Sequence, residues 1–288
     1  MGKIEKYHLH KDDYSKLHFE INDVGAYFER NQVRASKPHR HSFYQLIWFK
    51  KAGRHYVDYN VIDHPANSFF FINKNQIHYF CSDSVNEGYL YHFNDFFIER
   101  FNPKLMDRFH ISIFNEIGDC FVKLGEAEAE KLKAISSFIE AEMKTKEYLY
   151  KEQVFSLFQT ILLDAERANS KKGNVEYEND LDYALAVRFS NLVTRNIKEF
   201  WGIEKYATEL FTNPKKLSSS CKKYLMGTPA SIIKQRKVLE AKRMLANQKI
   251  AIKEIAYSLG FEDPTYFTKY FKKSTGLTPK DFQNTILL

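Results

Sequence analysis

The last hundred residues of the chain contain one pattern twice, about fifty residues apart, and this repeat limits the folds open to the chain. The second copy starts with apolar residues spaced i, i+3, i+4 and i+7, which indicates one buried face of a short helix. These residues are Ile252, Ile255, Ala256 and Leu259. Gly260 predicts the helix end, because glycine adopts a left-handed cap at little cost. Asp263 and Pro264 fit the N-cap and first position of a second helix.

The first copy is looser but keeps the same order of features. Ile203, Tyr206, Ala207 and Leu210 form its first helix face, and Asn213 followed by Pro214 predicts the start of its second helix. Residues 229 to about 247 predict a connecting helix of roughly 27 Å. That length is close to one turn of DNA, about 34 Å, so both second helices can reach successive major-groove segments. The layout is typical of a double helix-turn-helix DNA reader.

Residues 181–288 resemble the DNA-binding domain of AraC/XylS-type bacterial transcription regulators. The resemblance rests on residues 252–256, Gly260-Phe261, Tyr266-Phe267, residues 271–273, Gly276 and Thr278-Pro279. It implies base contacts from the second helix of each motif, at Lys215, Ser218, Ser219, Thr265, Tyr266 and Lys269. Phosphate contacts are expected from Lys222, Lys223, Lys272 and Lys273. The first motif departs from the family pattern at Cys221, where an aromatic residue is usual.

The charge of the chain is divided unevenly between its two parts. Residues 181–288 hold 19 Lys and Arg against 9 Asp and Glu, a net charge of +10, whereas residues 1–180 hold 24 against 27, a net charge of −3. A basic domain attracts DNA phosphates and releases their counterions. The alternative is a solvated cationic face on an ordinary helical bundle. The duplicated motif favours the DNA-binding interpretation.

Other sequence features exclude several classes of protein. The three cysteines, Cys81, Cys120 and Cys221, lie far apart and form no disulfide framework or cysteine zinc motif. The N-terminus lacks an apolar signal region, and no segment has about 18 uninterrupted apolar residues, so we expect a soluble cytoplasmic protein without membrane contact. Nucleophile and phosphate-loop motifs are also missing. We therefore expect no enzyme, no catalytic residues and no cofactor.

The N-terminal half is rich in Phe, Tyr and His and reads as short strands. Strands are predicted over residues 43–49, 54–63, 67–73, 76–80 and 88–93. Their even spacing suggests a small sandwich or barrel. Residues 14–101 resemble the cupin-type sensor domain of the same regulator family, through His39-Arg40-His41, residues 44–46, Gly53, residues 70–72 and Gln76-x-His78. The resemblance implies an all-β cupin-like barrel that binds a small effector.

Histidines and one glutamine are the candidate ligand-binding residues of this barrel. Alternate residues of a strand share a face, so His39, His41 and Gln45 are expected to point the same way. With His55 and His78 they form the predicted contact set for a small organic effector. Alternatively, the histidines hydrogen-bond within the barrel, or they bind a metal ion. Gln45 stands where enzymatic cupins carry an anionic glutamate, so no metal is expected.

Two amphipathic helices are predicted in residues 126–168. Their apolar stripes either pack against the barrel or, as in the resembled family, form a homodimer interface; we expect a homodimer. Residues 169–180 are polar and predict a linker. The expected organisation is an all-β sensor barrel over 1–125, a helical pair over 126–168, a linker over 169–180 and an all-α double helix-turn-helix domain over 181–288.

These features predict a sequence-specific transcription regulator that binds double-stranded promoter or operator DNA. An effector in the barrel would shift the populations of two arrangements of the chain, and RNA polymerase is a further candidate partner. Two other classes remain open at this point. One is a cupin-type metalloenzyme or isomerase with an accessory nucleic-acid domain, and the other is an architectural DNA-binding protein that reads no sequence.

Overall fold

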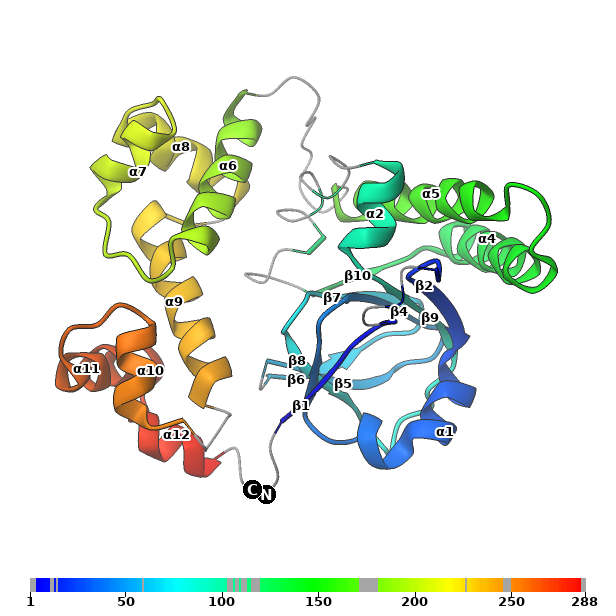
Figure 1. Ribbon diagram of the computed structural model, residues 1–288, viewed down its shortest axis with the longest axis horizontal. Helices are drawn as coiled ribbons and strands as arrows, with labels where there is room; N and C mark the ends of the chain where they lie inside the picture. The colour runs from blue at the N-terminus through cyan, green and yellow to red at the C-terminus, as the bar shows by residue number, and fades with distance from the viewer. Residues whose placement is uncertain are drawn as a thin grey trace. The chain divides into compact units, whose positions relative to one another are not determined.

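The computed structural model describes residues 4–10, 13, 15–58, 60–102, 106, 109, 113–114, 120–170, 181–225, 227–245 and 250–285. The chain divides into two compact units, the first ending at residue 175 and the second beginning at residue 176 (Figure 1). The first unit contains two sheets and the second is helical, which confirms the predicted fold classes. Most of the expected linker, residues 171–180, lies outside the described residues.

The first unit contains two five-stranded sheets and several helices. Its strands are β1 (Glu5–Tyr7), β2 (Phe19–Asp23), β3 (His39–His41), β4 (Tyr44–Phe49), β5 (Gly53–Val57), β6 (Asn60–His64), β7 (Ser68–Ile72), β8 (Ile77–Phe80), β9 (Gly88–Phe93) and β10 (Phe121–Lys123). Its helices are α1 (Val24–Ala35), α2 (Asp95–Phe101), α4 (Glu126–Thr145) and α5 (Tyr150–Ser170). The last of these extends two residues into the segment expected as a linker.

The strand order corrects the expectation of a closed barrel. One sheet has the order β1-β3-β8-β5-β6 and the other has the order β10-β7-β4-β9-β2. In the described residues no strand pair joins the two sheets, so the unit is built from two separate sheets. The chain changes sheets between His41 and Tyr44, where we expected one continuous strand face.

A second correction concerns residues 54–63, which form the hairpin β5–β6 and not one strand. Asp58 takes a positive φ of 45° at the end of β5. Aspartate tolerates this left-handed conformation better than most residues, so it suits a tight turn. The Asp58 carboxylate also accepts a hydrogen bond from the backbone N–H of Ile77 on the neighbouring strand (3.2 Å).

Alternation along β4 creates two apolar cores. Leu46 and Trp48 face one way and belong to a core that the second sheet shares with α2, α4 and α5. Ile47 and Phe49 face the other way, into a core between the two sheets that also includes Phe80. The helical pair therefore packs with its apolar stripes on the outer face of the second sheet (Figure 1). The inner face of that sheet carries part of this apolar core together with Gln45, one of the candidate ligand-binding residues.

The second unit arranges two helix-turn-helix motifs around a connecting helix. Its helices are α6 (Leu181–Arg195), α7 (Ile203–Glu209), α8 (Pro214–Tyr224), α9 (Pro229–Leu245), α10 (Ile252–Ser258), α11 (Pro264–Thr275) and α12 (Pro279–Thr285). The pairs α7–α8 and α10–α11 are the two predicted motifs, at opposite ends of α9 (Figure 1). Leu217, Ile232 and Phe267 are fully buried on α8, α9 and α11.

Candidate nucleic-acid interface and sensor site

The second helix of each motif begins with the predicted cap. The Asn213 side-chain oxygen accepts a hydrogen bond from the backbone N–H of Lys216 (2.8 Å), and α8 starts at the next residue, Pro214. The Asp263 carboxylate accepts one from the backbone N–H of Thr265 (2.8 Å), and α11 starts at Pro264. Both prolines occupy the first helical turn, where a missing N–H costs nothing. These caps set both helices in the same register.

The turns within the two motifs differ at one position. Gly260 adopts a φ of +82° between α10 and α11, whereas Phe211 holds a φ of 54° at the equivalent position of the first motif. In both turns the following residue donates a backbone hydrogen bond to the alanine of the first helix, Thr212 to Ala207 (2.9 Å) and Phe261 to Ala256 (3.0 Å). A bulky residue in this conformation costs roughly 1–2 kcal/mol. The first motif therefore keeps the turn at an energetic cost that the second avoids.

The predicted DNA-facing residues lie on the surface of α8 and α11. Lys215, Ser219, Lys222, Lys223, Thr265, Tyr266, Lys269, Lys272 and Lys273 are exposed, and Ser218 is half-buried. Four exposed positions of α8 recur fifty residues later in α11, namely 215, 219, 222 and 223 against 265, 269, 272 and 273. Both helices therefore present one polar face of matching geometry. The role of each side chain in base or phosphate contact stays a prediction.

Charge on these faces is concentrated at the last helical turn. Lys222 and Lys223 lie in the last turn of α8, and Lys272 and Lys273 in that of α11. Cations there interact favourably with the negative end of the helix dipole. By contrast, the exposed Lys216 pairs with Asp182 on α6 (2.6 Å), so its charge is partly neutralised within the unit. Cys221 is fully buried, and burial raises the pKa of its thiol to about 12.

Lys237 is a structural residue of α9 that the sequence analysis did not single out. Its side chain is only 3% exposed. The ammonium group donates hydrogen bonds to the carbonyls of Glu199 (3.2 Å) and Leu259 (3.3 Å) and lies 3.5 Å from the centre of the Phe200 ring. Burial lowers its pKa to about 8. Lys237 thus ties α9 both to the loop before α7 and to the end of α10.

The candidate sensor residues gather between the two sheets. His39 and His41 lie on β3, His55 on β5 and His78 on β8, all in the first sheet, and Gln45 lies on β4 in the second. All five side chains are buried. His39 pairs in register with His78 across β3 and β8. The structure therefore brings together all the residues predicted for ligand binding, although they come from two separate sheets and not from one closed barrel.

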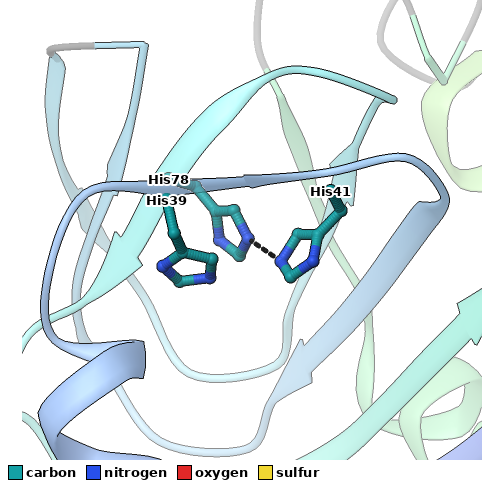
Figure 2. Close-up of side chains that lie close together, drawn as sticks. All are labelled: His39, His41 and His78. Carbon is teal, nitrogen blue, oxygen red and sulfur yellow. Dashed lines mark hydrogen bonds between the residues drawn. The ribbon is translucent and has the colours of Figure 1, made fainter. Parts of the chain in front are cut away.

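Three of these histidines form a continuous chain of imidazole rings. His41 Nε2 lies 2.9 Å from His78 Nε2 (Figure 2). On its other side, His78 Nδ1 lies 3.2 Å from His55 Nε2. Burial lowers the pKa of His41 and His78 well below the usual range, and it lowers the pKa of His55 to about 3. These rings are therefore neutral at physiological pH, and each carries one N–H and one lone pair.

Gln45 belongs to a second polar group, which the sequence analysis missed. Its Nε2 lies 2.8 Å from His92 Nε2 on the adjacent strand β9, and His92 Nδ1 lies 3.4 Å from Glu20 Oε2 on β2. The pKa of Glu20 is lowered, mainly by its hydrogen bond to His92. Alternation in the strand over 88–93 places His92 on the face of buried Leu90, but its pairing with Gln45 depends on a non-local register.

Two protein families match the two units of the chain. The family described as an AraC-like ligand binding domain matches residues 23–141, and the family described as a helix-turn-helix domain matches residues 206–285. A sheet-rich ligand-binding unit followed by two helix-turn-helix motifs defines a class of two-unit DNA-binding proteins. The chain carries an AraC-like ligand binding domain followed by a helix-turn-helix domain, the two domains of AraC-type regulators.

The curated relatives match about a third of the chain. The HTH-type transcriptional regulator YobQ of Bacillus subtilis is 34% identical over 104 residues, which cover 36% of this chain and 41% of YobQ. The virulence regulon transcriptional activator VirF of Yersinia enterocolitica is 29% identical over 103 residues, 34% of this chain and 36% of VirF. The chain therefore spans less than half the length of these relatives. Both are named as transcription regulators, in line with the expectation of a protein that is not an enzyme.

Among solved structures, the match to ToxT of Vibrio cholerae extends over most of this chain and most of ToxT. The match includes 92% of this chain and 98% of ToxT, at 19% identity and a TM-score of 0.45. Another ToxT structure carries a bound unsaturated fatty acid, with 18% identity and a TM-score of 0.44. Within the described residues, every helix is too short or too polar to cross a lipid bilayer.

Proposed function

We propose that the chain is a sequence-specific DNA-binding transcription regulator whose activity responds to a small effector in the sheet-rich unit. The observation that carries this proposal is the duplicated, equally capped second helix, with exposed polar residues at matching positions of α8 and α11. A non-specific cationic surface needs no such repeat of helix register. The family of the N-terminal unit supports the effector, because it is described as ligand-binding.

The proposed DNA contacts follow from helix geometry. Thr265 and Lys269 lie one turn apart on α11, as do Lys215 and Ser219 on α8, so each pair can present two side chains to neighbouring base edges. The lysines in the last turn of each helix are the proposed phosphate contacts. The 17-residue α9 sets the two motifs about 26 Å apart along its axis, close to one turn of DNA.

The proposed regulatory step is a shift between populations of the chain. A ligand of the sensor site changes DNA affinity only to the extent that it binds one conformation of the chain more tightly than the other. Its proposed contacts are His39, His41, Gln45, His55 and His78. Because these side chains are buried, a bulky organic effector must displace them on entry. The proposal also includes a homodimer and contact with RNA polymerase. Access to chromosomal DNA requires a cytoplasmic location.

Selection of binding sites from a random DNA pool with the full-length chain tests this function. We expect an enriched motif with two half-sites about one helical turn apart, because two second helices read the same face of the duplex. The double variant Lys215→Ala, Lys269→Ala is expected to blur both half-sites. Binding without an enriched motif would replace the proposal with an architectural DNA-binding role. Absence of DNA binding would refute both.

A further inference from the structure

Three histidine rings converge between the sheets from two paired strands. His39 and His41 are alternate residues of β3, and His78 faces them from β8 (Figure 2). One ring nitrogen from each lies within 4.8 Å of the others. Two of these nitrogens, on His41 and His78, are already 2.9 Å apart. Nitrogens around a tetrahedral zinc ion lie about 3.3 Å apart, given Zn–N bonds of about 2.0–2.1 Å, so a small movement of the His39 ring completes the set.

The outer side of the cluster is arranged as metal sites require. His39 Nδ1 lies 2.8 Å from the carbonyl oxygen of Lys37 and must donate to it, which leaves a lone pair on Nε2, the nitrogen on the opposite side of the ring. His78 Nδ1 contacts His55 Nε2 at 3.2 Å, which orients the His78 ring. Ligating histidines commonly hold their second nitrogen against such a partner, because it fixes tautomer and ring orientation.

Without a ligand, the imidazole chain has unsatisfied ends. Each of its two N···N contacts uses one proton, and in either direction of donation both end nitrogens, His41 Nδ1 and His55 Nδ1, have no hydrogen-bond partner in the described part of the chain. A buried polar atom left in this state costs roughly 1–3 kcal/mol. A cation that binds the Nε2 lone pairs of His41 and His78 replaces the N···N contact between these two atoms. The proton of each ring then lies on Nδ1.

The packing also selects the size of the ligand. His41 is 1% exposed and His78 is 0% exposed, and Phe43 packs against His41 with ring centres 4.4 Å apart. A single ion needs only small movements of such rings, whereas an organic molecule must displace them. Three neutral imidazoles suit zinc, nickel, cobalt and copper, and they do not suit magnesium or calcium, which prefer oxygen ligands.

We propose that the sheet-rich unit binds one divalent transition-metal ion of the zinc class through His39, His41 and His78. The sequence argument against a metal rested on Gln45, but this side chain lies on the other sheet against His92, and the three-nitrogen set does not use it. A fourth coordination position is left for water or an external ligand. Binding of the ion follows from the geometry of the three histidines and does not depend on the proposed function. A role of the ion as the regulatory signal does rest on the proposed function.

The test uses the full-length chain without a polyhistidine tag, stripped by a chelator and then dialysed against a small excess of Zn²⁺. We expect about one zinc per chain by elemental analysis, and a visible absorption band of tetrahedral type when Co²⁺ replaces Zn²⁺. The cobalt spectrum needs no variant, so it stands even where a substitution unfolds the unit. A folded wild-type chain that retains no zinc and gives no cobalt band would overturn the proposal.

Variants locate the ion. His78→Ala and the pair His39→Ala, His41→Ala are expected to lose the metal, while His64→Gln, a buried histidine of the same unit that bonds a backbone carbonyl, is expected to keep it. His55→Phe removes only the partner of His78 and is expected to weaken zinc binding about 10–100-fold. Unchanged zinc content in a folded His78→Ala chain would refute the site. DNA binding, measured on the same samples, tests the proposed function separately.

Discussion

At the residue scale, two glycines of the helix-turn-helix unit share one backbone conformation in different surroundings. Gly260 and Gly276 both have a φ of +82°. A Cβ atom at Gly260 would lie 1.7 Å from the carbonyl oxygen of Lys198, whereas a Cβ at Gly276 meets nothing within 4 Å. The first glycine is therefore required by both conformation and close approach, and the second by conformation alone.

Alanine substitutions separate these two requirements. We expect Gly276→Ala to lower the free energy of unfolding by about 1 kcal/mol, the cost of a left-handed alanine. We expect Gly260→Ala to cost at least about 3 kcal/mol, because the backbone at Lys198 must also move. Urea unfolding of the full chain, followed by Trp201 fluorescence in a Trp48→Phe background, measures both. Equal losses for the two variants would contradict the close approach.

Lys237 makes stability depend on pH in a defined window. Its folded-state pKa of about 8 lies below the usual 10.5 because of burial, so between these values the unfolded chain holds one more proton than the folded chain. Stability from this group therefore rises with pH across that window, by on the order of 3 kcal/mol. We expect Lys237→Met to abolish this rise. Unfolding measured from pH 7.5 to 10.5 checks it.

The matched control for this experiment is Lys234→Met, which removes an exposed lysine from the same helix. Its stability profile is expected to run parallel to that of the wild type, since its side chain is in solvent in both states. If the Lys237→Met profile also runs parallel to the wild type, the burial of the ammonium group has no energetic consequence and the assignment fails.

At the scale of the element, two lysines of α11 have different proposed roles, one in base contact and one in phosphate contact. Lys269 lies mid-helix on the exposed face and Lys272 lies in the last turn. We expect Lys269→Ala to lose about 1–3 kcal/mol on the selected site and to relax preference at one base pair. We expect Lys272→Ala to weaken all sequences alike and to reduce the salt slope by about 1. Titrations on specific and random duplexes at several salt concentrations measure both.

A lysine of the sheet-rich unit is the control for these titrations. Lys133→Ala removes an exposed charge from α4 and is expected to change neither preference nor salt slope. Equal losses for Lys269→Ala on specific and random DNA would contradict a base-reading role. A salt slope unchanged in Lys272→Ala would contradict a phosphate contact.

The elements of the helical unit could be predicted because their signals are local. Asn213-Pro214 and Asp263-Pro264 start helices through contacts within three residues, and the structure confirms both caps. In the sheet-rich unit, the prediction of one strand over 54–63 was wrong, because apolar alternation continues through a turn that depends on Asp58. The helix α1 was also missed, since its stripe of Val24, Phe28 and Ala35 is short.

The candidate site was predictable only in part for the same reason. His39 and His41 share a face by alternation, which the structure confirms, but their meeting with His78 depends on the register of β3 against β8. Gln45 was placed beside them by counting along one strand, whereas the chain passes into the other sheet before Tyr44. Burial of Lys237 depends on two carbonyls 38 and 22 residues away, and composition carries no signal for that.

At the scale of the whole molecule, the helical pair of the sheet-rich unit leaves a large apolar side chain exposed. The stripes of α4 and α5 bury Leu132, Ile139 and Phe158 against the second sheet. Phe138 on α4 is 62% exposed. Packing on the sheet and dimerisation are therefore not exclusive, because different faces of α4 serve them. This residue is the centre of the dimer interface that we propose.

Phe138→Asp tests that interface. An aspartate buried without a partner is strongly unfavourable, so we expect the dimer to weaken at least about tenfold while the fold of the monomer is kept. The control is Val33→Asp on α1, which changes another exposed apolar residue of the same unit and is expected to leave assembly unaltered. Sedimentation equilibrium over a range of concentrations measures both variants. A Phe138→Asp chain that dimerises like the wild type would place the interface elsewhere, and a wild-type chain that stays monomeric throughout would refute the homodimer.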